Sequence, residues 1–165
     1  MEDILFRNEH KESELGNVCD VLTRPRLWVP TSLDYPSHGE WVEKVEAQLG
    51  NGQKRAMLAY RGNVPIGVCV YQRHPNIPGA IEIKNLSVTP DAQGHYIGAF
   101  LLRNTELEGT QNDFPECYIL IGDTKITNLE MINFLIGQGY FPQEITDLYK
   151  TDTSLDITLT KTLLN

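Results

Sequence analysis

The hydrophobic pattern of the chain switches between short, nearly continuous apolar runs and longer stretches in which apolar residues recur at helical spacing. The runs are rich in β-branched residues and predict strands at residues 3–8, 55–60, 65–72, 80–88, 117–121, 141–150 and 154–161. The helical spacing predicts helices at residues 12–24, 38–49, 96–108 and 128–136. Together, the two kinds of element indicate a mixed α/β fold.

Two connections predict how neighbouring strands pair. A tight turn through Gly62 and Asn63 joins the strands at 55–60 and 65–72, which favours an antiparallel hairpin. The helix at 96–108 separates the strands at 80–88 and 117–121 and has the length that a parallel crossover needs. We therefore expect those two strands to lie side by side and parallel.

The length and composition indicate one soluble domain over residues 1–165. A chain of this size buries enough surface to fold without a metal or disulfides, and no repeat or linker interrupts it. No apolar run approaches the roughly 20 residues that span a bilayer, so we expect no membrane contact. The first residues lack a basic segment followed by an apolar run, which favours a cytoplasmic location.

Charge and cysteine usage exclude several function classes. The formal net charge is −8, and no cluster of lysine and arginine resembles a nucleic-acid footprint. Such a surface would attract a cationic acceptor such as an amine, although surface acidity often only keeps a protein solvated. The three cysteines and four histidines lack the spacing of a zinc site or a disulfide framework, so we expect no metal.

The junction between the strand at 80–88 and the helix at 96–108 is the most informative stretch. The strand ends at Thr89-Pro90, and the helix begins just after Gln93-Gly94. A glycine-bearing turn into a helix N-terminus leaves free backbone N–H groups at the positive end of the helix dipole, which is a place for phosphates. The same arrangement is common in α/β proteins that bind nothing there.

This stretch resembles the acetyl-coenzyme A motif of the GNAT superfamily of N-acetyltransferases. In that family a strand ends in a V-x-P-like turn and leads into [Q/R]-x-x-G-x-[G/A] and a helix; here Val88 begins the turn, Gln93 leads the motif and Gly98-Ala99 closes it. Tyr96 stands where the first motif glycine is usual. A side chain at that position limits positive φ and close approach to a diphosphate.

A second stretch carries the resemblance toward the C-terminus. NLEMINFLIGQGY, at residues 128–140, resembles the family's N-x-x-A-x-x-x-Y-x-x-x-G-[F/Y] segment, with Asn128 and Gly139-Tyr140 matching. Leu135 occupies the place of a tyrosine that many members use to protonate the departing thiolate. The terminal DITLTKTL resembles the family's last strand, so the resemblance covers most of the chain, strongly from about Arg55 onward.

The resemblance implies both a fold and an activity. The implied fold is a mixed, mostly antiparallel central sheet with a parallel pair splayed around an acyl-coenzyme A slot and helices on both faces. The implied activity is N-acetyl transfer from acetyl-CoA to a primary amine of a small molecule or a protein. The alternative is a catalytically inactive acyl-CoA-binding or protein-interaction module with the same fold. A homodimer through the terminal strands is one arrangement that the resemblance allows.

The resemblance also assigns cofactor-binding residues. Leu86, Ser87 and Val88 would line the slot for pantetheine, and Asn128 would contact the pantetheine arm. The diphosphate would be held by the turn, whose residues are Gln93, Gly94, Tyr96, Ile97, Gly98 and Ala99. The alternative interpretations are an ordinary strand residue for Ser87 and a helix N-cap for Asn128.

For the catalytic base, the resemblance points to Glu82, because a carboxylate in the middle of this strand lies where many members place their base. Partial burial would raise its pKa toward the working pH. The alternative is a strand glutamate paired with Lys84 or with a cation on the next strand. Tyr140 and Tyr149 are candidate acids only through their position, and we expect both to be packing residues.

Overall fold

The structure is a computed structural model that describes residues 3–8, 15–23, 38–148 and 155–163. Its strands are β1 Ile4–Asn8, β2 Lys54–Arg61, β3 Val64–Arg73, β4 Ala80–Val88, β5 Ile119–Lys125, β6 Phe141–Thr146 and β7 Asp156–Thr162. Its α-helices are α1 Leu15–Thr23, α2 His38–Gly50, α3 Ile97–Glu108 and α4 Leu129–Gly137. The predicted elements that fall in these ranges are all present, with shifted ends.

The strands form one seven-stranded sheet in the order β1-β2-β3-β4-β5-β7-β6. The hairpin of β2 and β3 is antiparallel, and Gly62 in its turn has a φ of 59°. The pairing of β4 with β5 is parallel, as the crossover through α3 predicts, and the other neighbours are antiparallel. The last strand, β7, lies between β5 and β6 and completes the mixed, mostly antiparallel sheet.

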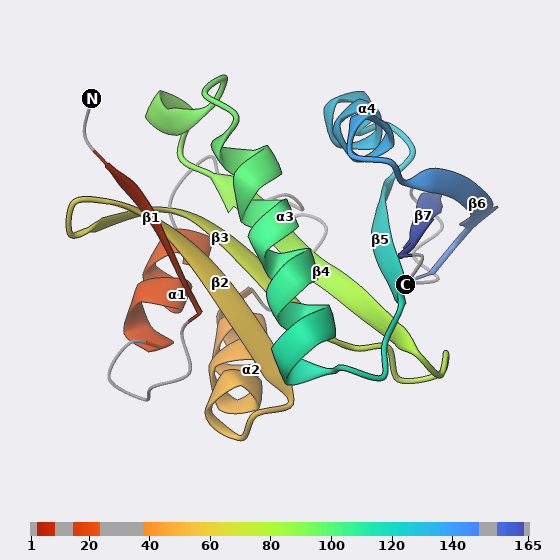
Figure 1. The fold of residues 1–165 in the computed structure, drawn as a ribbon, viewed down its shortest axis with the longest axis horizontal. Coiled ribbons are helices and arrows are strands. Elements are labelled where there is room, and N and C mark those ends of the chain that lie inside the picture. Colours follow the sequence, from red (N-terminus) through yellow and green to blue (C-terminus); the bar gives the residue numbers. More distant parts are fainter. Residues whose placement is uncertain (1–2, 9–14, 24–37, 149–154, 164–165) are drawn as a thin grey trace.

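Helices cover both faces of the sheet, and strand alternation decides which residues face which helix. Along β2, Ala56 and Leu58 belong to the core under α1 and α2, whereas Met57 and Ala59 belong to the core under α3. Figure 1 shows α3 crossing one face and α1 and α2 lying against the other. The sheet therefore separates two apolar cores.

A buried polar network ties α3 to the C-terminal strands. The Tyr140 hydroxyl donates to Glu106 Oε1 at 3.0 Å, and Lys161 Nζ donates to Glu106 Oε2 at 2.7 Å. Tyr140 is fully buried and Glu106 is 6% exposed. Because both carboxylate oxygens have donors in a poorly solvated place, this network holds α3 at a fixed position over the sheet.

The segment between α3 and β5, for which the sequence predicts neither a helix nor a strand, is partly helical. Residues Gly109–Asp113 continue the helix as a wide π-helical turn. The turn is held because the Tyr71 hydroxyl donates to Asp113 Oδ2 at 2.6 Å and Arg55 pairs with the same carboxylate. Further on, Cys117 N donates to Phe114 O, which closes a turn at residues 115 and 116, and β5 begins at Ile119, two residues later than predicted.

Several sequence predictions fall outside the described residues. Most of the loop expected before α2 lies there, and so does Tyr149. Among the helices of the described ranges, none is long and apolar enough to cross a bilayer. In the same ranges, no group of three histidine, cysteine, aspartate or glutamate side chains converges in a way that could hold a metal ion.

Replacing Glu106 tests the buried network. Glu106→Gln removes the charge that Lys161 needs as its partner, so we expect the free energy of unfolding to fall by about 2–4 kcal/mol. Urea denaturation measures the change. The matched control is Glu43→Gln, because Glu43 is an exposed glutamate on α2. This substitution should change the free energy of unfolding by less than about 0.5 kcal/mol. Equal effects of the two substitutions would contradict the proposed importance of the network.

Candidate functional site

The parallel pairing of β4 and β5 stops in the middle of both strands. The last paired residues are Ile83 and Gly122. At that point Lys84 is an extra residue in β4, because Val70 and Tyr71 of β3 pair with Asn85 and Ile83. The bulge turns the rest of β4 away from β5, and Figure 1 shows the two strands separating toward α4. Backbone groups of 84–88 that point toward β5 therefore have no strand partner there.

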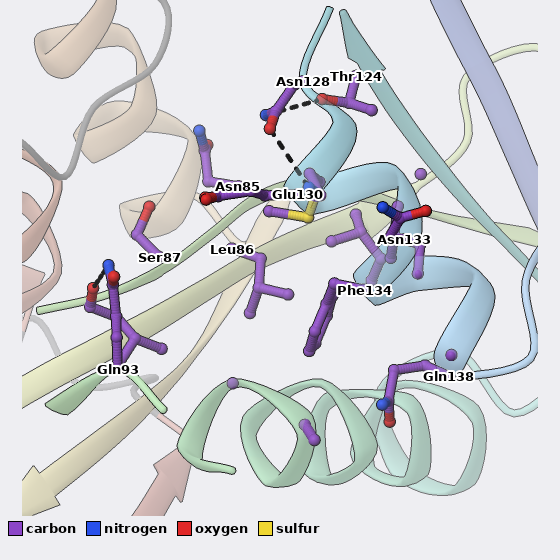
Figure 2. A pocket seen from close by; sticks show the side chains of 18 of the residues that line it. Asn85, Leu86, Ser87, Gln93, Thr124, Asn128, Glu130, Asn133, Phe134 and Gln138 are labelled. Atoms are coloured by element: carbon purple, nitrogen blue, oxygen red, sulfur yellow. Dashed lines mark hydrogen bonds between the residues drawn. The ribbon is translucent and has the colours of Figure 1, made fainter. Parts of the chain in front are cut away.

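A cavity of about 770 Å³ fills the space between the separated strands. Its walls are the second half of β4, the start of α3, the end of β5 and one side of α4. In Figure 2, Leu86 of β4 and Phe134 of α4 project into this space above the first turn of α3. All the residues that the sequence predicts to bind cofactor line it: Leu86, Ser87, Val88, Gln93, Gly94, Tyr96, Ile97, Gly98, Ala99 and Asn128.

The turn from β4 into α3 keeps its shape despite a tyrosine at the usual glycine position. Tyr96 has a φ of 60°, and it is the one non-glycine residue with positive φ in the described part of the chain. The expectation that its side chain would limit this conformation is wrong. Tyr96 is 78% exposed, so its side chain lies away from the core. Its carbonyl accepts the first hydrogen bond of the helix, from Phe100 N. The left-handed backbone costs about 1–2 kcal/mol.

The first turn of α3 offers free hydrogen-bond donors to the cavity. Tyr96 is the N-cap residue and its side chain makes no capping bond, so the N–H groups of Ile97, Gly98 and Ala99 have no partner from it. These amides stand at the positive end of a twelve-residue helix. A Cβ built on Gly98 would lie 3.6 Å from Val88 Cγ2, which is an ordinary packing contact.

The side chain of Gln93 holds the other end of this turn. Its Nε2 donates to the carbonyl of Val88 at 2.9 Å, which fixes the loop between strand and helix. Gln93 thus acts on the backbone, and the groups that this turn could offer to a phosphate are main-chain amides.

Asn128 and Asn85 place amide groups on opposite walls of the cavity. Asn128 is the N-cap of α4: its Oδ1 accepts from Met131 N at 3.3 Å, and its Nδ2 donates to Thr124 Oγ1 at 3.2 Å. The capping role expected as the alternative is confirmed, and one Nδ2 hydrogen stays available. Asn85 was not predicted. Its Oδ1 is buried and accepts no hydrogen bond from the described residues, so it can accept one from a ligand.

Glu82, the predicted base, lies beside the cavity and does not line it. The residue is 7% exposed, and both of its carboxylate oxygens are occupied. Lys84 Nζ lies 2.7 Å from Oε1, and Gln72 Nε2 donates to Oε2 at 2.8 Å. The ion pair with Lys84, considered as the alternative from sequence, is therefore present. Whether Glu82 also removes a proton from an amine stays a prediction.

Asp123 is a carboxylate that sequence reasoning missed. It follows Gly122, the last residue of β5 that pairs with β4, and it lines the cavity. Its Oδ1 accepts a hydrogen bond from Thr158 Oγ1 at 2.6 Å. Burial raises the pKa of the Asp123 carboxyl above its usual value, and the charge of Glu82 adds to the rise. The strand was predicted to end at residue 121, which placed Asp123 in a loop and hid it.

Lys54 also went unnoticed in the sequence. It is 6% exposed at the start of β2, and its Cα partner on β3 is Gln72, which in turn pairs with Glu82. Burial lowers the pKa of the Lys54 ammonium to about 8, and the positive charges of Lys84 and Lys44 act in the same direction. The surroundings of Lys54 therefore disfavour its charged form.

Of the positions considered for an acid, Leu135 and Tyr140 lie in the described part of the chain, and neither provides one in the cavity, whereas Tyr149 lies outside it. Leu135, at the usual tyrosine position, is 3% exposed and packs under the strand, since a Cβ on Gly122 would lie 3.3 Å from its Cδ1. Tyr140 is held by Glu106, and its burial raises the pKa of its hydroxyl. The expectation that Tyr140 is a packing residue is consistent with these contacts.

Comparisons with known proteins relate the chain to acetyltransferases. The model of the acetyltransferase (GNAT) family matches residues 19–140. A search of curated proteins finds no match. Among solved structures, one assigned to the GNAT family from Desulfovibrio desulfuricans has a TM-score of 0.77 at 15% identity, covering 98% of this chain and 100% of that chain.

Two further structures show the same fold. An acetyltransferase from Elizabethkingia anophelis with acetyl-CoA bound has a TM-score of 0.68 at 20% identity, covering 99% of this chain and 100% of that one. The ribosomal-protein-S18-alanine N-acetyltransferase from Escherichia coli has a TM-score of 0.70 at 14% identity, covering 99% and 96%. At these identities the likeness is one of fold.

The buried charge of Lys54 predicts a pH-dependent effect on stability. The folded chain binds this proton less tightly than the unfolded chain, whose lysine pKa is 10.5, so the charge destabilises the fold below a pH of about 8. We expect Lys54→Met to unfold at a higher temperature than the wild type at pH 7. The difference should shrink as the pH rises from 8 to 10.5. Thermal unfolding at both ends of this range measures it, and a difference independent of pH would contradict the assignment.

Proposed function

Because the chain belongs to the GNAT acetyltransferase family, we propose that it moves an acetyl group from acetyl-CoA to the primary amine of an acceptor. The family uses acetyl-CoA as its cosubstrate, and related structures hold coenzyme A or acetyl-CoA. The observation that carries the proposal is the cavity between β4 and β5, which opens where their pairing ends.

The residues that line the cavity fit this cosubstrate in three places. The unpaired backbone of 84–88 can hydrogen-bond an extended pantetheine chain as a neighbouring strand would. The free amides at the start of α3 suit its diphosphate. The amide groups of Asn85 and Asn128 can bond to the pantetheine amides from two sides. Bound acetyl-CoA supplies the thioester that is cleaved.

In the proposed transfer, the residues at the bulge position the reacting groups. The C–N bond forms as the C–S bond breaks, the amine loses a proton, and the thiolate gains one. Leu135 carries no hydroxyl, so the thiolate is protonated by another group or by water. Backbone N–H groups beside the bulge at Lys84 would polarise the thioester carbonyl.

Two carboxylates can receive the proton of the amine. Glu82 is the sequence prediction, but a cation and an amide already engage both of its oxygens, and it does not line the cavity. Asp123 has one oxygen bonded to Thr158 and a raised pKa, and it lines the cavity. These contacts favour Asp123 as the base, with Glu82 holding Lys84 in place.

Binding of the cosubstrate is tested first, by calorimetric titration of acetyl-CoA and coenzyme A. We expect roughly micromolar dissociation constants for the wild type. Gly98→Trp fills the space above the first turn of α3 and should abolish binding. Gly98→Ala is the matched control, because a Cβ there makes only ordinary contacts of 3.6 Å and longer. A folded wild-type protein that binds neither compound would refute the proposal.

Acetyl transfer is tested with a panel of primary amines, monitored by release of the coenzyme thiol. We expect Asp123→Asn to lower kcat by about 100-fold or more without weakening acetyl-CoA binding, since general-base catalysis contributes on this scale. Glu82→Gln should cost less and leave the pH dependence of the rate in place. The reverse ranking would assign the base to Glu82. Binding without transfer to any amine would favour the inactive module.

A further inference from the structure

A row of polar side chains continues from the bulge across the sheet, on the face that α1 and α2 partly cover. Lys54, Gln72 and Glu82 are successive Cα partners on β2, β3 and β4. Alternation along β2 places Lys54 on the same face as Ala56, which belongs to the core under α1 and α2. We call Lys54, Gln72, Glu82 and Lys84 the polar row.

The polar row carries more positive than negative charge, although the whole chain has a net charge of −8. Its single carboxylate, on Glu82, is shared by Lys84 and Gln72. Lys44 of α2 adds a further positive charge that acts on Lys54. The site is therefore a local exception in an acidic protein, and it would attract an anion.

Lys54 is the member of the row that lacks a partner. Within the described residues, no ion pair or hydrogen bond engages its ammonium, even though the residue is 6% exposed. With a pKa of about 8, roughly ten molecules in eleven carry the charge at pH 7. A buried cation without a counter-ion is costly, so such a residue is commonly kept for a ligand.

The row begins where the acetyl group would be delivered. Lys84 lies in the bulge and lines the cavity, while Glu82 and Lys54 extend from it away from α3. Asp123 is close enough for the charges of Glu82 and Lys84 to act on its pKa. A molecule bound along the row would have one end at Asp123 and the thioester and the other toward Lys54, which lies on β2, two strands beyond β4; the two ends must therefore be several bonds apart. In the proposed function that molecule is the acceptor, because the coenzyme would lie on the opposite side of the bulge.

We propose that the polar row binds an anionic group of the acceptor, a carboxylate several bonds away from the amine that is acetylated, with Lys54 as its main ligand. This inference rests on the proposed acetyl transfer and narrows its substrate class to amino carboxylates. Lys54 pairs with the carboxylate, and Asp123 faces the amine. The same chemistry occurs in a free amino acid with a side-chain carboxylate and in a peptide whose second residue is acidic.

Acetylation of matched acceptors tests the proposal. One arm compares free L-aspartate and L-glutamate with L-asparagine and L-glutamine, and the other compares tripeptides with aspartate or asparagine at the second position. A charge-assisted hydrogen bond predicts a kcat/KM about 10- to 100-fold higher for the acidic member. The arm in which the preference is larger identifies the source. Equal rates for acids and amides in both arms would overturn the proposal.

Substitutions of Lys54 link the preference to this residue. Lys54→Met should remove the preference, so that kcat/KM for the acidic acceptor falls to about the value for its amide in the same variant. Lys54→Arg should retain most of it, because the charge is kept. Lys44→Met is the matched control: Lys44 is an exposed lysine on α2, and its loss should change the preference by less than about threefold. A preference that survives in Lys54→Met would overturn the assignment.

A readout without catalysis separates this inference from the proposed function. The pKa of Lys54 can be followed by NMR of the lysine side chains, with Lys54→Met giving the assignment. N-acetyl-L-amino acids, which carry the carboxylate without the reactive amine, should raise this pKa toward 10.5, whereas their amides should not. A Lys54 pKa unchanged by every acid would refute the anion site, even in a protein that transfers acetyl groups. A raised pKa without transfer would support the site alone.

Discussion

The candidate site depends on the backbone hydrogen bonds that β4 and β5 do not form beyond Ile83 and Gly122. Inside a sheet, such groups normally pair with the neighbouring strand, and leaving them unpaired costs free energy unless water or a ligand replaces the partner. The extra residue Lys84 makes the separation part of the register, so closing it would require a slip of the strand. The gap is thus a stable feature of the fold.

The elements on either side of the gap are held by contacts outside it. Glu106 fixes α3 to the C-terminal strands through Tyr140 and Lys161, and Asp113 fixes the end of the helical segment to β3 through Tyr71. The N-terminal turn of α3 therefore stays at the mouth of the cavity. Such rigid support explains how the left-handed Tyr96 persists, because local strain of this kind needs surroundings that permit no other conformation.

Charge at the bulge is arranged at some cost to stability. Glu82 satisfies Lys84, which leaves Lys54 as a buried cation and Asp123 as a carboxyl whose ionisation is disfavoured. Binding an acceptor with an amine and a carboxylate would relieve both, since each end of the acceptor provides the opposite charge. The unfavourable charge interactions that lower the stability of the free protein would then strengthen the binding of this class of acceptor.

The sequence alone determined the order of the elements, the hairpin, the parallel crossover and the turn into α3, because these follow from local periodicity and from glycine and proline at turns. Through its resemblance to a family, the sequence also selected a set of cofactor-binding residues, and all of them line one cavity in the structure. Tertiary structure decided the rest. The position of β7 between β5 and β6, the ion pair of Glu82, and the approach of Lys54 and Asp123 to the bulge involve residues far apart in the chain. Their contacts depend on strand register, which local patterns do not contain.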